Sequence, residues 1–432
     1  MHVKHTQPKR LSIGIVGGGI GGVAFAVALS RDSGLDVQLF EAAPQFSEIG
    51  AGVSFGPNAV RAIQLLGLDE AYQRIADDSP APFEDVWFEW RRGSDDTYLT
   101  ASLAPGVGQS SVHRADFLDA IVAHLPEGIA HFGKRCVAVT QDAASATAHF
   151  DDGTHFTGDV IIGFDGIKSA VRSHVLPPDQ FGDIAPFWSG TYAYRGMIPT
   201  HTLETVLEAN GSEKRLAWVP QMYLGKDRHI LTFPVKQSQL VNVVAFITDR
   251  SVPHPRLPDG EEWVQAVSQQ EMLHVFEGWS PACQAILASI AEPTRWALHE
   301  LPELPFYQRE RVMVVGDAAH ALVPHQGAGA GQALEDAYVL ATLLTDVRCD
   351  HRRVSDVLAA FEHVRHARTC RAQRTSHDAG DVYEYSGKGI GGDESKLIHD
   401  LENRFDWLWT HDPHDDVIAA RQYLETVSRD RL

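Results

Sequence analysis

Cysteine is scarce in this chain, which contains only four among 432 residues. They are Cys136, Cys283, Cys349 and Cys370. No two of them form a CxxC pair or another closely spaced set of metal ligands, which argues against a metal or redox motif built from neighbouring cysteines. We therefore expect unpaired thiols, as in a protein of a reducing compartment.

Basic residues are also in short supply. Lysine and arginine number 37 against 57 aspartates and glutamates, which gives a formal net charge of −20. A surface of this sign repels the phosphates of nucleic acids and of anionic lipids. We therefore expect no nucleic acid and no membrane as partners, and we predict a soluble cytoplasmic protein.

Charged residues are absent from residues 11–29, a run whose length approaches that of a membrane span. The run contains six glycines and shows no small-residue cleavage signature, so neither an anchor nor a signal peptide is expected. A buried strand, a glycine turn and a buried helix explain the run better.

The glycines of this run follow a nucleotide-binding pattern. Gly17, Gly19 and Gly22 have the G-x-G-x-x-G spacing between a predicted strand and a predicted helix. The first allows a tight turn, the second lets a pyrophosphate approach, and the third lets the helix pack closely. A second predicted strand ends in Glu41, which can accept a hydrogen bond from a ribose hydroxyl. The pattern predicts a dinucleotide-binding domain without distinguishing NAD from FAD.

A second G-x-G-x-x-G spacing occurs at residues 387–392. No apolar strand precedes it and no apolar helix follows it, so the context that the motif requires is missing. We predict a loop there.

Three further stretches accompany the first motif: SSVHRADF with Arg114, DVIIGFDGIKSAVR with Asp165, and RVMVVGDAAHALVPHQGAGAGQALEDA from residue 311. With GGGIGG they resemble the single-component flavoprotein aromatic hydroxylases, the family that includes para-hydroxybenzoate hydroxylase. The similarity spans nearly the whole chain. Within the family it is greatest to the salicylate hydroxylases, through stretches such as EDVWFEWRRGSD and LAPGVGQSSVHRADF.

The resemblance implies that FAD is the bound cofactor and that NADH is a transient co-substrate without a domain of its own. It implies that Asp317 contacts the ribityl or pyrophosphate part of FAD and that Arg114 contacts its middle section. It also implies that Gly327, Gly329 and Gly331 lie against the isoalloxazine ring. The cofactor-binding residues expected in total are Gly17, Gly19, Gly22, Glu41, Arg114, Val137, Asp165, Asp317, Gly327, Gly329 and Ala330.

The N-termini of two predicted helices are also expected to lie near the cofactor. QALEDAYVLATLL is expected to form a helix whose positive N-terminal end points at the flavin and favours negative charge on the ring. Asp165 is linked in the family to FAD and pyridine-nucleotide handling. It also fits an N-cap of the following helix, and both interpretations can hold together.

The predicted fold class is α/β, with a Rossmann-like FAD-binding domain, an inserted β-sheet substrate domain like that of para-hydroxybenzoate hydroxylase, and a helical C-terminal part. Strand-like aromatic segments from Phe187 to Asp249 mark the insertion, with a hairpin turn at residues 225–227. Residues 90–95, WRRGSD, fit a solvated turn. The expected divisions are residues 1–186 for the first part of the FAD-binding domain, 187–282 for the substrate domain, 283–386 for the second part, and 387–432 for the C-terminal segment.

The side chains expected to act on substrate follow from the same resemblance. His325 is the candidate base for a phenol proton, and a structural loop histidine is the alternative. Arg250 is the candidate partner of a substrate carboxylate, although an arginine beside an aspartate is often a surface residue. Arg195 and Tyr223 are weaker candidates, because strand alternation does not fix which face of their strands meets the pocket. His320 is expected to support its motif by packing or hydrogen bonding.

The resemblance implies an aromatic monooxygenase that uses NADH and O2 through a flavin 4a-hydroperoxide, and acts on salicylate with loss of carbon dioxide to give catechol. A hydroxylase of another hydroxybenzoate that retains the carboxylate is one alternative, and a flavin-binding sensor without turnover is another. We expect a monomer or homodimer with no bound metal. Since the late glycine run completes the flavin site, the chain is expected to return to the first domain after the insertion.

Overall fold

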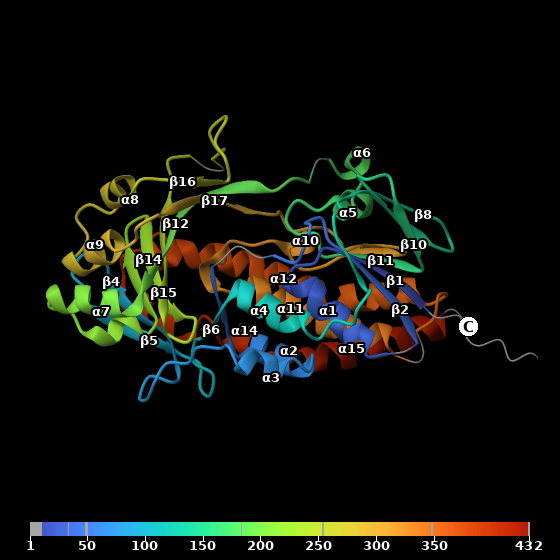
Figure 1. Ribbon diagram of the computed structural model, residues 1–432, viewed down its shortest axis with the longest axis horizontal. Coiled ribbons are helices and arrows are strands. Elements are labelled where there is room, and N and C mark those ends of the chain that lie inside the picture. Colours follow the sequence, from blue (N-terminus) through green and yellow to red (C-terminus); the bar gives the residue numbers. More distant parts are fainter. Residues whose placement is uncertain are drawn as a thin grey trace, which may run out of the picture.

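The computed structural model describes residues 11–32, 34–47, 51–182, 184–252, 255–346 and 349–430. Figure 1 shows an elongated molecule with a sheet-based region at each end. The helix α12 (Val354–Tyr383) runs along the long axis between these regions. With 30 residues it is about 45 Å long at 1.5 Å per residue.

A six-stranded sheet forms the region of the predicted nucleotide fold. Its strands, in spatial order, are β18 (Gln308–Arg309), β19 (Val312–Val314), β11 (Val160–Gly163), β1 (Leu11–Val16), β2 (Leu35–Phe40) and β7 (Ala130–His131). All neighbouring pairs are parallel except β18 with β19. The central strands β1, β11 and β19 are short and largely buried, as is usual for parallel sheets, and this explains their mainly apolar sequence.

Helices cover one face of this sheet and a small antiparallel sheet covers the other. The helices α1 (Ile20–Ser30) and α11 (Gly329–Leu344) share one apolar core with β1 and β2. On the opposite face lie α5 (Ala170–Val175) and the sheet of β8 (Cys136–Gln141), β9 (Ala146–Phe150) and β10 (His155–Gly158). The predicted Rossmann-like arrangement is therefore confirmed.

An eight-stranded sheet forms the other region. Its strands in spatial order are β16 (Val264–Ala266), β17 (Thr294–Glu300), β12 (Phe187–Pro199), β15 (Leu240–Thr248), β14 (Arg228–Val235), β13 (Gln221–Gly225), β4 (Val86–Arg92) and β5 (Tyr98–Leu103). The helices α7 (Thr200–Ala209), α8 (Gln269–Val275) and α9 (Pro281–Ala288) lie at this end (Figure 1). The predicted hairpin turn joins β13 to β14.

This sheet includes strands from outside residues 187–282, the range expected for the substrate domain. β4 and β5 come from the segment predicted to belong wholly to the first part of the FAD-binding domain. β17 lies beyond residue 282 and pairs with β12. β4 and β5 join the sheet because β4 pairs in parallel with β13. This contact is non-local, so no local sequence pattern predicts it.

The expectation of a solvated turn at residues 90–95 is correct only for its second half. Trp90 is fully buried in β4 and its indole N–H donates to the Ser102 hydroxyl. Arg91 is buried beside Glu89, with which it forms an ion pair. The chain turns only after Arg92, since the aromatic and arginine side chains before it find partners inside the fold.

Several further helices complete the fold. They are α2 (Pro57–Leu65), α3 (Asp69–Gln73), α4 (Arg114–Val122), α6 (Pro178–Phe181), α10 (Asp317–His320), α13 (Glu394–Asn403), α14 (Asp406–Trp409) and α15 (Pro413–Asp430). A two-stranded sheet of β3 (Gly52–Phe55) and β6 (Ser110–His113) lies between them, and two 3-10 turns cover Lys214–Ala217 and Pro324–Gln326. Residues 387–392 form turns with no strand before them, as predicted.

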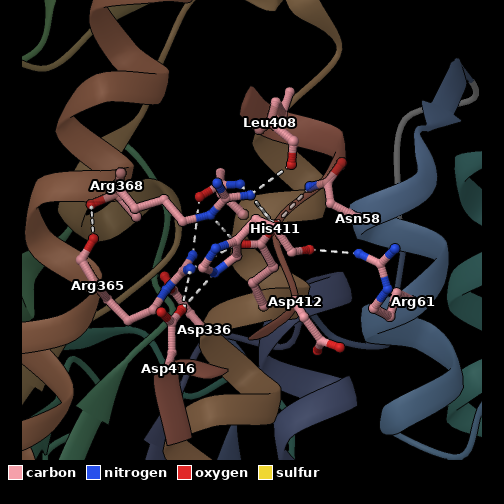
Figure 2. Close-up of polar contacts among 12 residues, drawn as sticks. Asn58, Arg61, Asp336, Arg365, Arg368, Leu408, His411, Asp412 and Asp416 are labelled. Carbon is pink, nitrogen blue, oxygen red and sulfur yellow. Dashed lines mark hydrogen bonds and ion pairs between the residues drawn. The ribbon is translucent and has the colours of Figure 1, made fainter. Parts of the chain in front are cut away.

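A buried charge network fastens the C-terminal helices to α11. Arg365 on α12 is fully buried and bonds Glu335, Asp336 and Asp416. Arg368, one turn further on, donates to Glu335 and to the main-chain oxygen of Leu408 (Figure 2). Burial alone would raise the pKa of Glu335, but the two arginines outweigh it and hold that pKa well below its usual value. The network ties α15 to the core rather than leaving it as a loose tail.

The four cysteines are free thiols. Within the described ranges no helix is long and apolar enough to cross a membrane, and no cluster of three or more histidine, cysteine, aspartate or glutamate side chains could hold a metal ion.

Candidate functional site: a cavity between the two sheets

A cavity of about 440 Å³ lies where the two regions meet. Its walls come from the glycine turn after β1, the loop after β19, the start of α11, and the inner face of the large sheet. The residues that line it include Gly19, Trp87, Phe88, Arg114, Phe164, Gly166, Arg195, Met222, Leu231, Phe246, Asp317, His325, Gly327, Gly329 and Ala330. This volume lies in the usual range for small-molecule sites, about 300–1,000 Å³.

The first glycine motif forms the turn that the sequence predicts. Gly17 has a φ of +109°, and a Cβ there would clash with the carbonyl of Phe164. A Cβ on Gly22 would clash with the carbonyl of Gly17, so the third glycine packs the helix against the turn itself. Gly19 precedes α1 and lines the cavity. The turn therefore brings the N-terminus of α1 to the cavity wall.

Two helix N-termini face this cavity without a side-chain cap among the described residues. They belong to α1, which begins after Gly19, and to α11, which begins at Gly329. The first N–H groups of a helix have no partner within the helix and carry partial positive charge. Such ends bind phosphates and other anions. This arrangement fits the pyrophosphate and the flavin ring of FAD.

Glu41 follows β2, as the motif requires, but its carboxylate already accepts two main-chain hydrogen bonds. One comes from Gly18 N at 2.6 Å and the other from Ala43 N at 2.7 Å. An ionised carboxylate offers about four acceptor positions. Glu41 therefore braces the glycine turn and keeps lone pairs for a hydroxyl donor.

Asp165 faces away from the cavity and into a helix start. Its carboxylate accepts from the Ser169 hydroxyl at 2.6 Å and from the N–H groups of Ala170 and Val171 at the start of α5. Burial is the main influence on its pKa, which is raised above the usual value. Its neighbour Gly166 lines the cavity. Asp165 therefore shapes the loop through helix capping, the interpretation that the sequence left open.

Val137 lies on β8 with 54% of its surface exposed. It is not among the residues that line the 440 Å³ cavity. The adjacent Cys136 lies close enough to Asp165 for that carboxylate to contribute to the raised pKa of the thiol, for which burial is the larger cause. Val137 is thus a surface residue near the Asp165 loop.

The second glycine run closes the cavity from the other side. Asp317 starts α10, lines the cavity and is exposed. Gly327 adopts a left-handed conformation with a φ of +65°, which favours glycine. Gly329 and Ala330, at the start of α11, also line the cavity. These four residues present main-chain atoms and one carboxylate to the same space.

Gly331 does not share this location, contrary to expectation. A Cβ on Gly331 would lie 2.9 Å from the Cβ of Ala59 on α2. Its requirement is close packing of α11 against α2, and it is absent from the cavity lining. Periodicity explains the difference, because successive residues of a helix face different directions.

His320 is a supporting residue, as predicted. It is buried, and its Nε2 lies 2.6 Å from Oδ2 of Asp336. The same oxygen accepts from Gly316 N at 3.0 Å. Asp336 is labelled in Figure 2, where it also meets Arg365. The buried network of α12 therefore reaches the loop that carries Asp317.

His325 lies in the cavity wall and is 7% exposed. Its ring packs against Phe246 and His229, each with a centroid separation of 5.2 Å. Its Nδ1 is buried with no hydrogen-bond partner among the described residues. Burial is the main cause that lowers the pKa of His325 well below its usual value. The imidazole is therefore neutral near pH 7, which suits a proton acceptor.

Arg195 is the arginine that the large sheet presents to the cavity. It lies on β12, its guanidinium stacks on Trp296 at 4.8 Å, and its Nε is buried without a partner among the described residues. Burial and then the charge of Arg114 lower its pKa to about 10. Arg195 therefore stays charged at neutral pH, and a nearby anion would relieve the repulsion between the two arginines.

Arg250 lies outside this cavity, which corrects the expectation of direct contact with a substrate carboxylate. Its guanidinium forms ion pairs with Asp227, Asp381 and Glu384. Asp381 at the end of α12 and Glu384 just after it are more than 130 residues away in sequence. These carboxylates already balance the charge of Arg250. Glu384, His229 and His325 lie in that order between Arg250 and the cavity.

The inner face of the large sheet supplies apolar walls. Met222 lines the cavity, whereas Tyr223 faces the opposite way into the core formed with α7 and α9. Strand alternation therefore removes Tyr223 from the site. Trp87 on β4 also lines the cavity, and its indole N–H is buried without a partner in the described part of the chain. The sequence did not single out Trp87, because only the parallel pairing of β4 brings it here.

The chain matches the family model described as "FAD binding domain" over residues 10–376. The cavity and this match define the class: the chain belongs to the family of FAD-dependent monooxygenases that includes the salicylate hydroxylases. FAD is its cofactor.

Individual relatives within this family show a more specific similarity. The chain is 56% identical over 414 residues to a salicylate hydroxylase of Pseudomonas putida, covering 96% of this chain and 95% of the relative. It is 37% identical to a 6-methylsalicylate 1-monooxygenase of Aspergillus terreus, covering 94% and 91%. A solved structure of a salicylate hydroxylase substrate complex superposes with a TM-score of 0.89 at 45% identity, covering 95% of this chain and 98% of that one.

Proposed function

We propose that this enzyme hydroxylates salicylate at the ring carbon that bears the carboxylate, releasing carbon dioxide and forming catechol, with NADH and O2 as co-substrates. The observation that carries the proposal is the 56% identity to a salicylate hydroxylase over nearly the full length of both chains. The largely apolar cavity, with the buried His325 and with Arg195 in its wall, suits a flat ring with a phenol and a carboxylate. We propose a cytoplasmic monomer or homodimer.

The residues of the first glycine motif would hold the adenosine and pyrophosphate half of FAD. Gly17, Gly19 and Gly22 bring the N–H groups of α1 to the pyrophosphate. Glu41 accepts from a ribose hydroxyl with the lone pairs that its two main-chain bonds leave. Val137, exposed on β8, would border the adenosine end.

The residues of the second glycine run would hold the ribityl chain and the flavin ring. Asp317 accepts from ribityl hydroxyls, and Arg114 contacts the middle of the cofactor. Gly327, Gly329 and Ala330 let the ring lie against main chain. Asp165 acts through the loop that it caps.

The chemistry divides between the cofactor and the protein. Bound FAD, reduced by NADH, activates O2 for transfer of one oxygen atom to the ring. His325 accepts the phenolic proton, so that electron density rises at the carbon that bears the carboxylate. Trp87 and Met222 close the cavity against water.

The substrate carboxylate requires a cation. Arg195 is our first candidate, because its Nε is buried beside the cavity without a partner among the described residues. A guanidinium can bond both oxygens of a carboxylate. Arg250, with three carboxylates around it, acts on the reaction indirectly.

Product analysis with purified enzyme, salicylate, NADH and O2 tests the proposal, together with the absorption spectrum of the bound flavin. We expect catechol and carbon dioxide in amounts that match the NADH consumed. A hydroxylated product that keeps its carboxylate would identify a different hydroxybenzoate hydroxylase. NADH oxidation that no aromatic acid stimulates would identify a flavin-binding protein without this activity.

A further inference from the structure

A line of buried polar side chains leads from His325 away from the flavin cavity. It passes through His229 and Glu384 to Arg250, which borders a second cavity of about 640 Å³. His325 contributes to the walls of both cavities.

His229 has a defined tautomer. It lies on β14 with its side chain fully buried, and its Nδ1 is 2.9 Å from Oε1 of Glu384. An ionised carboxylate only accepts, so Nδ1 carries the hydrogen and Nε2 of the neutral ring carries a lone pair. That Nε2 is buried with no partner among the described residues, and the ring neighbours that of His325. No hydrogen bond therefore joins the two imidazoles, and the ring of His229 links that of His325, by packing, to the carboxylate of Glu384.

Glu384 remains ionised in this setting. It follows the end of α12, and its side chain is fully buried. Burial alone would raise its pKa, but the hydrogen bond from His229 and the charge of Arg250 outweigh that effect and lower the pKa to about 2. Arg250 is in turn bonded to Asp381 at 2.7 Å. A fixed negative charge thus lies directly behind His229.

The need for such a charge follows from the burial of His325. A buried imidazole that accepts a phenolic proton becomes a cation in an apolar environment, which is costly unless the charge is paired. His325 itself has no hydrogen-bonded carboxylate among the described residues, whereas the neighbouring ring of His229 bonds Glu384 at 2.9 Å. Burial lowers the pKa of His325, and the charge of Glu384 opposes this effect, so it favours the imidazolium.

We propose that His229 and Glu384 are positioning residues that stabilise the charge of His325 when it holds the phenolic proton during hydroxylation, an inference that rests on the proposed function. The phenol O–H bond breaks as an N–H bond forms on His325, which becomes an imidazolium. The carboxylate of Glu384, held by its hydrogen bond to His229 behind the packed imidazole pair, offsets this charge. When the product forms, the N–H bond on His325 breaks and the proton passes to the product oxygen.

The charged and titratable groups around the two imidazoles come from three places. Glu384, Asp381 and His377 approach from the end of α12. Arg250 follows β15, and Asp227 lies in the turn between β13 and β14. Among these groups, Glu384 is the carboxylate that bonds one of the two imidazoles directly, that of His229.

The test uses His229→Gln and Glu384→Gln in the FAD-loaded enzyme, with Tyr223→Phe as the matched control. Tyr223 is buried on the neighbouring strand, faces the opposite side of the sheet, and has no hydroxyl partner among the described residues. Hydroxylation is measured on salicylates whose ring substituents lower the pKa of the phenol by increasing amounts. The bound flavin spectrum and circular dichroism report whether each variant is folded.

We expect both variants to lower kcat for salicylate by about tenfold or more, less than removal of the base itself, with KM nearly unchanged. The deficit should shrink as the phenol becomes more acidic, because an ionised substrate needs no proton acceptor. The control should match the wild type across the series. An equal deficit for every phenol would mean a merely structural role and would overturn the proposal, as would wild-type rates.

A binding measurement without NADH provides a second test that can be used even if a variant is too unstable for kinetic measurements. A ring-nitrated salicylate changes its visible spectrum when its phenol ionises. The wild type should bind it as the phenolate at a pH below its solution pKa, and the two variants should bind more of the neutral phenol. Identical spectra would overturn the inference. Wild-type enzyme that forms no catechol from salicylate would instead refute the proposed function.

Discussion

The main chain of Gly380 lies directly against the imidazole of His325. A Cβ at Gly380 would be 2.7 Å from both Cδ2 and Nε2 of that ring. Gly380 belongs to α12 and His325 to the short turn Pro324–Gln326, so the contact joins two elements that meet only in the folded protein. The position of the proposed base therefore depends on the absence of a side chain on a neighbouring helix.

Gly380→Ala should reduce hydroxylation while FAD stays bound. Alanine would favour the helix by about 1 kcal/mol on propensity alone, so lower activity would have to come from displacement of His325. We expect a loss of about 10²-fold in coupled hydroxylation, since small misplacements of reacting groups cost this much. Gly392→Ala, with nothing within 4 Å of its Cβ, is the control. Normal activity in the Gly380 variant would show that the His325 position is uncritical.

His325→Ala should leave FAD bound and slow hydroxylation of salicylate by about 10²- to 10⁴-fold, the usual contribution of a general base. The ratio of catechol formed to NADH consumed distinguishes this loss from a loss of flavin reduction. If coupled turnover remains near the wild-type value, His325 is a structural loop residue.

Arg195→Met and Arg250→Met should have different kinetic effects. A lost charged hydrogen bond costs about 1.5–3 kcal/mol, so the Arg195 variant should raise KM for salicylate by roughly 10- to 150-fold. The Arg250 variant should lower kcat more than it raises KM, because Arg250 lies behind Glu384. Phenols without a carboxylate serve as control substrates, on which the Arg195 penalty should disappear. The reverse pattern would restore Arg250 as the direct contact.

Arg365→Met should destabilise the protein strongly. It would leave Glu335, Asp336 and Asp416 without their shared cation, and breaking a buried ion pair typically costs about 3–5 kcal/mol. Arg374→Met removes an exposed pair with Glu303 and should cost less than about 1 kcal/mol. Urea unfolding of the FAD-loaded proteins measures both. Similar values for the two variants would mean that the buried network adds little stability.

Acid should destabilise the wild type partly through Glu384. Because its pKa is lowered from 4.5 to about 2 in the folded protein, its contribution is fully present above about pH 4.5 and is lost as the pH falls toward 2. Glu384→Gln should therefore lower the free energy of unfolding at pH 7 and weaken its dependence on pH below 4.5. A variant with the wild-type slope in this range would place the acid sensitivity elsewhere.

The sequence predicted the parts of the site that local patterns determine. The turn at Gly17 and the helix after it depend on residues within one short segment, and the glycines are required where a Cβ would clash. The support of His320 was also foreseeable, since Asp336 lies only 16 residues away. Local backbone chemistry was sufficient in these cases.

Residues whose role depends on distant partners were not predictable. Arg250 looked available for a ligand because Glu384, 134 residues later, gives no sign of its pairing in the sequence. Trp87 appeared to precede a solvated turn, because the pairing of β4 with β13 is non-local. Gly331 and Gly329 are equivalent in a motif, and only the direction of α11 separates a packing glycine from a lining one.

The parallel pairing of β4 with β13 also sets an order for synthesis of the protein. Arg91 and Gln221, which bond across these strands, are 130 residues apart. Until the ribosome has released the later strand, Trp87, Phe88 and Trp90 have no completed sheet to enter. A growing chain thus carries an aromatic surface for many seconds at ordinary elongation rates of about 5–20 residues per second. Trp87 and Phe88, which later line the cavity, are therefore accessible to chaperones during translation.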